Sequence, residues 1–202
     1  MRQAEDVILR DFILSACSII NASGGSNGDN PSEISVADCS LVAATLDNNN
    51  AMKFMSGIEG EDRFGTGPIR SAYFMLASTE QQPDFDRLAG NGFFSQWNYP
   101  NNTSALYSEY GSILNFRILT SSESAVSRGV SMNSRDVFYD YCVGKQAVTH
   151  IDQDQYSMQL IYRDPYFSGM LAQNATLAVK FAQSQAITQD TAIRILACTR
   201  FN

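Results

Sequence analysis

The single histidine offers the most direct route to metal chemistry in this sequence. His150 is followed by Asp152 and Asp154 at alternating positions of a predicted strand, so the three side chains could share one face. One imidazole and two carboxylates form a ligand set that divalent metals accept. The same alternation also fits a solvated strand face, because it supplies no groups that would orient the ligands. We therefore assign no metal residue and keep a metal-dependent enzyme only as an alternative hypothesis.

Two other carboxylate groupings could also do chemistry. Asp84 and Asp86 flank one position of a predicted short helix and could act as a general acid and base. Carboxylates at a helix start are also favoured by the helix dipole, which is the simpler interpretation. Glu59, Glu61 and Asp62 lie in a glycine-rich segment and could bind calcium, but their spacing is not that of an EF-hand. An exposed acidic loop explains them equally well.

Motifs for covalent catalysis and for phosphate binding are missing from the sequence. There is no Gly-x-Ser-x-Gly motif, and any Ser–His–Asp or Cys–His arrangement would have to use His150. The Gly-Thr-Gly-Pro segment at 65–68 is too short to cradle phosphate, and its proline lacks an amide donor. We therefore predict no catalytic residue, no cofactor-binding residue and no cofactor, and expect that the protein is not an enzyme.

One segment is rich in aromatic residues, namely Phe93, Phe94, Trp97 and Tyr99. Such side chains could stack on sugars or bases, which makes a glycan-binding module a further alternative. The surrounding sequence carries few cations, and aromatic residues are also enriched at subunit interfaces. A packed loop or a contact between subunits is the interpretation that we favour.

Amino-acid composition and net charge exclude further classes of protein. The chain has 202 residues, of which 44% are hydrophobic and 17% charged, and its 14 Lys and Arg against 21 Asp and Glu give a net charge of −7. This hydrophobic content excludes wholesale disorder, and the acidic balance disfavours a dedicated nucleic-acid-binding protein. No run of about 18 apolar residues is present, so we expect no membrane span.

The N-terminal residues and the cysteines bear on the compartment. Residues 1–6 carry charges of both signs and lack the order of a signal peptide, so we expect folding in a reducing cytoplasm. The four cysteines share no metal-ligand spacing and are expected to be buried free thiols. They are Cys17, Cys39, Cys142 and Cys198.

Helical patterns dominate the first part of the chain. Apolar residues recur at helical spacing over residues 2–20, which predicts one amphipathic helix. Ser35 and Asp38 match a capping box for a second helix that ends at the Asn48–Asn50 run. The predicted buried side of this helix consists of Val36, Leu41, Val42, Thr45 and Leu46. Residues 72–77 predict a buried strand, and Ser78 with Gln81 predicts the cap of a short helix reaching Leu88.

From residue 113 onward the apolar period changes to two. Strands are predicted near 113–118, 137–143, 146–151 and 156–162, followed by two long antiparallel strands around a turn at 188–190. Residues 90–111 are expected to be irregular. Helices followed mostly by strands indicate an α+β fold rather than alternating βαβ units.

Several short motifs occur in an order that resembles a known family. They are Arg2–Glu5 with Leu9–Asp11, Ile34–Asp38, Leu46–Ala51, residues 71–77 with Asp84–Leu88, Ser108–Ile113, Phe116–Ile118, Thr120–Ala125, Gly144–Ala147 and Asp164–Pro165. In this order the chain resembles the major capsid proteins of short-tailed phages, which have the Hong Kong 97-like fold. The family often has a His-Pro pair where this chain has Ala77-Ser78.

The resemblance implies a layout. Residues 1–34 and 163–202 would form the peripheral domain, a spine helix over long antiparallel strands, and residues 35–162 the axial domain. Since the sequence starts at the predicted helix, we expect no counterpart of the N-terminal arm and extended loop that such proteins carry.

The resemblance also implies a function. The protein would be a major capsid protein that self-assembles into pentamers and hexamers of an icosahedral phage head around double-stranded DNA. Its main partner would be itself, with decoration, scaffolding and portal proteins as further partners and only weak nonspecific contact with DNA. It would reside in the virion after assembly in the host cytoplasm. The shell of an encapsulin-like nanocompartment is the alternative within the same fold.

Overall fold

The computed structural model divides the chain into two compact units. It describes residues 10–23, 31–54, 71–88, 93–95, 109–130, 134–152, 159–165, 175–180 and 183–200. The first unit, here called the body, comprises Met1–Ala147 and Gln189–Asn202, and the second, called the ribbon, comprises Val148–Thr188. Each unit is described by itself.

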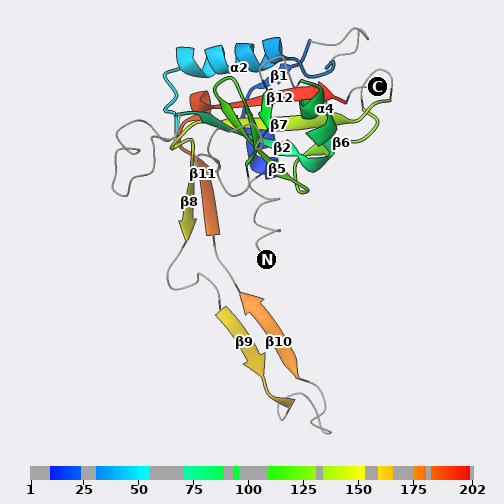
Figure 1. Cartoon of the computed structure of the whole chain (residues 1–202). Helices are drawn as coiled ribbons and strands as arrows, with labels where there is room; N and C mark the ends of the chain where they lie inside the picture. Colours follow the sequence, from blue (N-terminus) through cyan, green and yellow to red (C-terminus); the bar gives the residue numbers. More distant parts are fainter. Residues whose placement is uncertain are drawn as a thin grey trace, which may run out of the picture. The chain divides into compact units, whose positions relative to one another are not determined.

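The body is built on one mixed sheet with the strand order β1-β12-β7-β2-β5-β4-β3, in which β6 pairs with β7 (Figure 1). Its strands are β1 (Ile19–Asn21), β2 (Tyr73–Ser78), β3 (Phe93–Ser95), β4 (Glu109–Ile113), β5 (Phe116–Ser121), β6 (Val126–Ser127), β7 (Val137–Val143) and β12 (Ile193–Thr199). The pairs β1–β12 and β2–β5 are parallel, and the remaining pairs are antiparallel.

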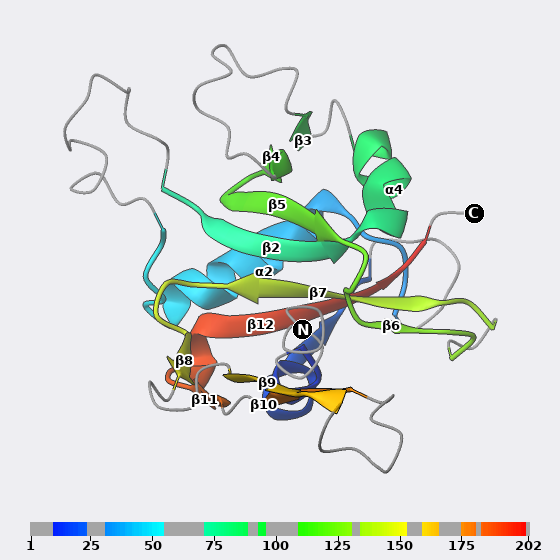
Figure 2. The ribbon, with the colours of Figure 1, turned by 90° about the horizontal axis from the view of Figure 1, so that it is seen from below.

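Helices cover the two faces of this sheet, as Figures 1 and 2 both show. Helix α2 (Val36–Asn48) lies on one face, where the Tyr73 hydroxyl of β2 donates to Asp47 Oδ1 at 2.7 Å. A helical segment at residues 10–16 lies on the other, where the Tyr141 hydroxyl donates to the Arg10 carbonyl at 3.4 Å. The central strands β7 and β12 are therefore buried on both faces.

The second predicted helix is confirmed, together with its cap. The Ser35 hydroxyl accepts from the Asp38 amide at 3.3 Å, and Asp38 Oδ2 accepts from the Ser35 amide at 3.1 Å, so two amides of the first turn are satisfied reciprocally. Val42 and Leu46 are buried as predicted, but Leu41 is exposed.

Other local predictions also agree with the structure. The strand predicted at 72–77 is β2, and the helix predicted after Ser78 is the 3-10 turn η1 (Thr79–Gln81) followed by α4 (Gln82–Arg87). All four cysteines are buried free thiols. Within the residues that the structure describes, no helix is both long and apolar enough to span a membrane.

The first predicted helix is too long at its C-terminal end. Helical structure covers residues 10–16, whereas Ile19–Asn21 form β1, which runs parallel to β12 with Ile19 opposite Ile195. Two adjacent β-branched isoleucines favour a strand once a partner strand is available, and the helical spacing of apolar residues does not reveal that partner. Residues 2–9 of the prediction lie outside the described residues.

Two predictions about strands also need correction. The strands around residues 188–190 do not pair with each other, because β12 pairs with β7 and β1, and the preceding strands belong to the ribbon. Residues 90–111, expected to be irregular, contain β3 and the start of β4, which pair with each other. Pairing partners far away in the sequence decide both cases.

The ribbon consists of two antiparallel ladders. Strand β8 (Val148–Asp152) pairs with β11 (Gln183–Ile187), and β9 (Gln159–Arg163) pairs with β10 (Thr176–Lys180). The strands predicted near 146–151 and 156–162 correspond to β8 and β9. The predicted domain assignment, 1–34 with 163–202 against 35–162, stays a prediction. The boundaries of the two compact units fall at other residues.

A buried ion pair joins β4 to β5 on the face of the sheet away from α2. Arg117 Nη1 lies 3.0 Å from Glu109 Oε2, and both side chains are almost completely buried. Two charges removed from water together depend on each other, because either one alone would be left uncompensated in a medium of low dielectric constant.

We predict that Arg117→Met lowers the free energy of unfolding by about 3–5 kcal/mol, because the Glu109 carboxylate then stays buried without the charge of Arg117. The double variant Arg117→Met/Glu109→Leu should recover most of that loss. Urea denaturation of the two variants and the parent chain measures both effects. As a control, Lys53→Met removes the more exposed pair with Asp47 (2.9 Å) and should cost about 1 kcal/mol or less. A double variant no more stable than the single one would contradict this account.

Candidate functional site

The predicted metal ligands fall in the ribbon. His150 and Asp152 lie in β8, where their backbones are opposite Gln185 and Gln183 of β11, and Asp154 lies outside the described residues. Among the described residues no group of histidine, cysteine, aspartate and glutamate side chains could hold a metal ion. The metal-dependent enzyme remains an untested hypothesis.

The two predicted carboxylates of α4 have different surroundings. Asp84 is buried, and its Oδ2 lies 3.9 Å from Arg200 Nε. Asp86 is exposed and accepts a hydrogen bond of 2.7 Å from the Tyr110 hydroxyl. Burial and this hydrogen bond raise the pKa of Tyr110 to about 12. Both carboxylates therefore contact residues outside α4, and the helix-dipole interpretation stays a prediction.

Most of the other candidates lie outside the described residues. They are Glu59, Glu61, Asp62, Trp97 and Tyr99. Phe93 and Phe94 lie in β3, where their backbones are opposite Ile113 and Ser112 of β4. The glycan-binding alternative therefore remains untested.

One face of the β9–β10 ladder is entirely apolar. Leu160 lies opposite Val179, and Tyr162 lies opposite Leu177, so all four side chains project from the same face. They are 64%, 39%, 59% and 66% exposed, respectively. We call these four residues the apolar ribbon face. The opposite face carries Gln159, Ile161, Arg163, Thr176, Ala178 and Lys180.

This face is the most prominent candidate for an interaction surface. Every residue of β9 and β10 is exposed, on both faces of the ladder. A two-stranded ladder is marginal in water unless its hydrophobic face packs against something else. Contiguous exposed apolar surface of this kind marks interaction sites. The alternation of Leu177 and Val179 was visible in the sequence, but their exposure was not.

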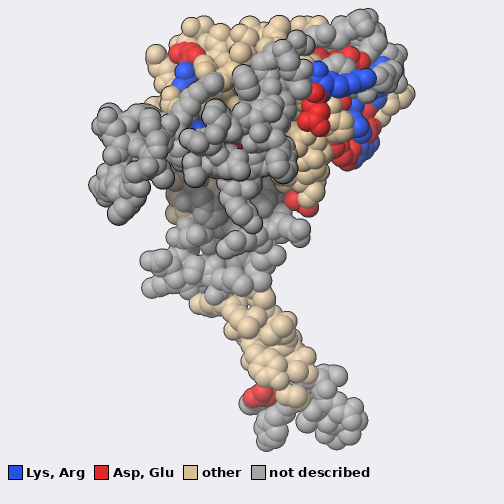
Figure 3. Space-filling view, in the orientation of Figure 1, with Lys and Arg blue, Asp and Glu red and all other residues tan. Residues whose placement is uncertain are grey.

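A second grouping consists of charged residues at the end of the body that carries η1 and β6. Figure 3 shows Lys/Arg and Asp/Glu side chains of both signs gathered there. Arg128 pairs with Glu80 of η1 and, at 2.6 Å, with Asp136, which precedes β7. Hydrogen bonds from Arg128 lower the pKa of both carboxylates. Because its partners are exposed, this network contributes mainly to the local geometry of the turn after β6.

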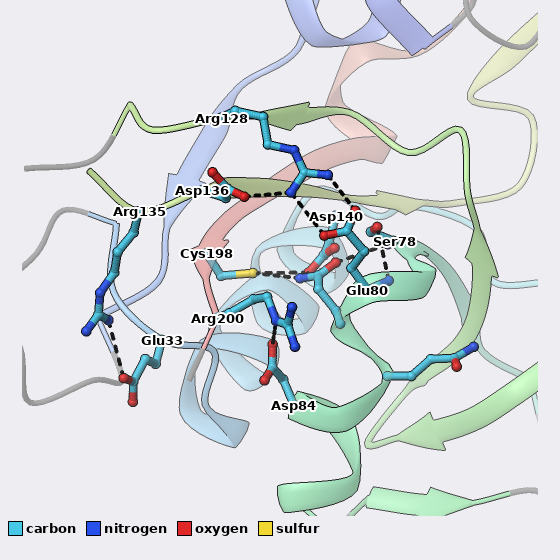
Figure 4. A network of polar contacts seen from close by, with 12 residues as sticks. Glu33, Ser78, Glu80, Asp84, Arg128, Arg135, Asp136, Asp140, Cys198 and Arg200 are labelled. Carbon is cyan, nitrogen blue, oxygen red and sulfur yellow. Dashed lines mark hydrogen bonds and ion pairs between the residues drawn. The ribbon is translucent and has the colours of Figure 1, made fainter. Parts of the chain in front are cut away.

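Beneath these ion pairs lies a buried carboxyl group (Figure 4). Asp140 of β7 is 0% exposed, and its Oδ2 accepts from Gln81 Nε2 at 3.2 Å and from Cys198 Sγ at 3.4 Å. Desolvation, with a smaller contribution from the charge of Asp84, raises the pKa of Asp140 to about 7, against the lowering effect of the Gln81 and Cys198 hydrogen bonds. Sequence patterns gave no sign of this group, because it stands in the middle of an apolar strand.

Three thiols lie around Asp140, from three elements. Burial, with added repulsion from Asp140, raises the pKa of Cys39 of α2 to about 12. The same two causes raise the pKa of Cys142 and Cys198 well above the ordinary value. Since the thiolate is the reactive form, the geometry here stabilises packing rather than nucleophilic chemistry.

We predict that all four cysteines react slowly with a thiol reagent in the folded protein and rapidly in denaturant. Burial blocks access and suppresses the thiolate, and both effects vanish on unfolding. Reaction with a chromogenic disulfide at pH 8, followed with and without urea, measures this. A thiol that reacts in the folded state as fast as a free peptide thiol would contradict the burial described.

Comparisons with known proteins extend this picture. No protein-family model and no curated protein sequence matches the chain. Among solved structures, it is similar to the SrpI encapsulin of Synechococcus elongatus PCC 7942, with a TM-score of 0.55 and 13% identity over 97% of this chain and 60% of that chain. It is also similar to the capsid of Ralstonia phage GP4, with a TM-score of 0.52 and 12% identity over 99% of this chain and 64% of that chain.

One of these structures is an encapsulin complex and the other is a phage capsid, and at this identity the likeness concerns the fold. The chain spans about two thirds or less of the length of each of these proteins. The α+β fold predicted from the ordered motifs is confirmed at this level. The chain has the Hong Kong 97-like fold that these phage capsid and encapsulin structures share.

Proposed function

We propose that this chain is a major capsid protein, a structural subunit that self-assembles into the pentamers and hexamers of an icosahedral phage head around double-stranded DNA. The observation that carries the proposal is the apolar ribbon face, which the chain leaves exposed. The fold supports it, since the structures that share it are shells. A shell subunit needs surfaces that become buried only when neighbouring copies meet.

Burial of the apolar ribbon face between subunits would contribute enough free energy to support assembly. Full burial of a Leu, Val or comparable side chain stabilises by about 1.5–3 kcal/mol, and the face offers four such side chains per subunit. Head-to-tail contacts between identical subunits close into rings when the rotation permits, so one such contact is used several times in a particle.

Charge is consistent with a container rather than a DNA-binding protein. The net charge of −7 would limit nonspecific attraction between the shell and packaged DNA. In this proposal DNA is touched only weakly, and decoration, scaffolding and portal proteins are the further partners. The protein resides in the virion and is assembled in the host cytoplasm, and it performs no catalysis. Residues 35–162 would supply the axial contacts and residues 1–34 with 163–202 the peripheral ones.

The shell of an encapsulin-like nanocompartment is the second candidate. The likeness to the SrpI encapsulin, with a TM-score of 0.55, favours it. The two candidates differ in their contents, because a phage head holds nuclease-protected DNA and a nanocompartment holds protein.

Electron microscopy of particles assembled from this protein, combined with analysis of their contents, tests the function. Icosahedral particles with rings of five and six subunits and nuclease-protected DNA are expected. Particles that enclose a protein cargo and no DNA would favour the nanocompartment, and monomers at high protein concentration would count against both.

We further predict that the double variant Leu160→Asn/Leu177→Asn abolishes assembly, because it replaces two side chains of the apolar ribbon face by polar ones. The matched control is Ile161→Asn/Ala178→Asn, a pair that lies directly across the same ladder on its opposite face. The control should still assemble, although it lowers strand propensity to a similar degree. Sedimentation velocity gives the fraction of assembled protein, and equal losses in both variants would show that the face itself is not the contact.

A further inference from the structure

Asp140 connects the sheet to the segment formed by η1 and α4. Its Oδ2 accepts from the Gln81 side-chain amide, and the Oε1 of the same Gln81 accepts from the Ser78 amide at 3.0 Å. One glutamine therefore joins the capping box of η1 to a carboxyl group of β7, as Figure 4 shows. Asp140 Oδ1 accepts no hydrogen bond within the described residues. When Asp140 is protonated, Oδ1 is the oxygen left to carry the proton.

Among the described residues, no cation contributes to the charge environment of Asp140. The titratable groups coupled to it from the packed elements are Cys39 in α2, Cys142 in β7, Cys198 in β12 and Asp84 in α4. The thiols stay neutral, and Asp84 repels a charge on Asp140. The two nearby arginines have other partners, since Arg128 pairs with Glu80 and Asp136, and Arg200 lies 3.9 Å from Asp84.

We propose that Asp140 is a pH-sensitive latch: protonated, it holds η1 and α4 against the sheet, and ionised, it favours their release. A neutral carboxyl group is tolerated in the buried space between β7, β12 and η1. An ionised one is supported there only by the Gln81 amide and the Cys198 thiol, so a local opening that admits water stabilises it. The segment that opens is residues 79–87, which comprises η1 and α4.

The direction of the pH effect follows from the two forms. The folded state raises the pKa of Asp140 to about 7 from an ordinary 3.8, so the folded state holds the proton more tightly than the opened state. The stabilisation by Asp140 is therefore complete below about pH 4 and is lost as the pH rises to about 7. Above that pH it changes no further, because Asp140 is then charged in both the closed and the open state. Over pH 5 to 8 the latch thus moves from closed toward open.

Hydrogen exchange tests the latch in the full chain. Protection of the amides at 79–87, corrected for the intrinsic exchange rate, should fall by up to about 100-fold between pH 5 and 8, because two units separate pH 5 from the folded pKa. Amides of the helical segment at 10–16, on the opposite face of the sheet, should change little. In Asp140→Asn, which keeps the shape and removes the charge, protection at 79–87 should no longer depend on pH.

Two control variants separate this effect from others. Asp86→Asn removes an exposed carboxylate of α4, and His150→Gln removes the one histidine of the chain, so both should retain the pH dependence. A pH dependence that persists in Asp140→Asn, or that is absent from the parent chain, overturns the proposal.

A measurement on the unaltered protein covers the case in which Asp140→Asn fails to fold. The carbon-13 chemical shift of the Asp140 carboxyl group reports its titration directly. A midpoint near pH 7 supports the latch, and a midpoint below pH 5 overturns it. Neither measurement depends on whether the protein forms a shell.

Discussion

The antiparallel pairing of β7 with β12 is the contact on which the rest of the body depends. It joins residues about 55 positions apart in the sequence, with Val137 opposite Thr199 and Val143 opposite Ile193. This pair gives α2 a surface on one side and the helical segment at 10–16 a surface on the other. It also creates the parallel edge on which β1 forms. Since burial on both faces makes these strands nearly continuous apolar runs, a polar residue within them is exceptional.

Two buried carboxyl groups in the described strands of the body, Glu109 in β4 and Asp140 in β7, differ in how their charge is compensated. Glu109 is paired with Arg117 at 3.0 Å, so both groups can remain charged without exposure to water. Asp140 has two uncharged donors and a neighbouring carboxylate, so its neutral form is the one that fits. Burying a charge is costly in both places. At Glu109 an ion pair with Arg117 offsets this cost, whereas at Asp140 the raised pKa reflects it.

The two compact units differ in how far their apolar side chains are buried. The body covers its sheet with helices, whereas β9 and β10 of the ribbon leave Leu160, Tyr162 and Leu177 in solvent. A chain that folds stably and yet exposes such a face is suited to association with further copies.

The amino-acid sequence by itself determined the local features. Ser35 and Asp38 predicted the start of α2, and the aromatic run predicted β2. These are decided by neighbours a few residues away, through capping and side-chain periodicity. Part of the candidate interface could also be predicted in this way. The apolar alternation of β10 is present in the sequence, but the exposure of these side chains is not.

Only the tertiary structure decided which strands pair and which polar groups are buried. Ile19 and Ile20 form a strand instead of the predicted helix because they pair in parallel with β12. The strands on either side of residue 188 have different partners, since β11 pairs with β8 and β12 pairs with β1 and β7. The raised pKa of Asp140 comes from its burial within the folded body and from the charge of Asp84 in α4. Each of these outcomes depends on contacts between residues far apart in the chain, and the periodicity of a single segment carries no information about which distant segment will cover it.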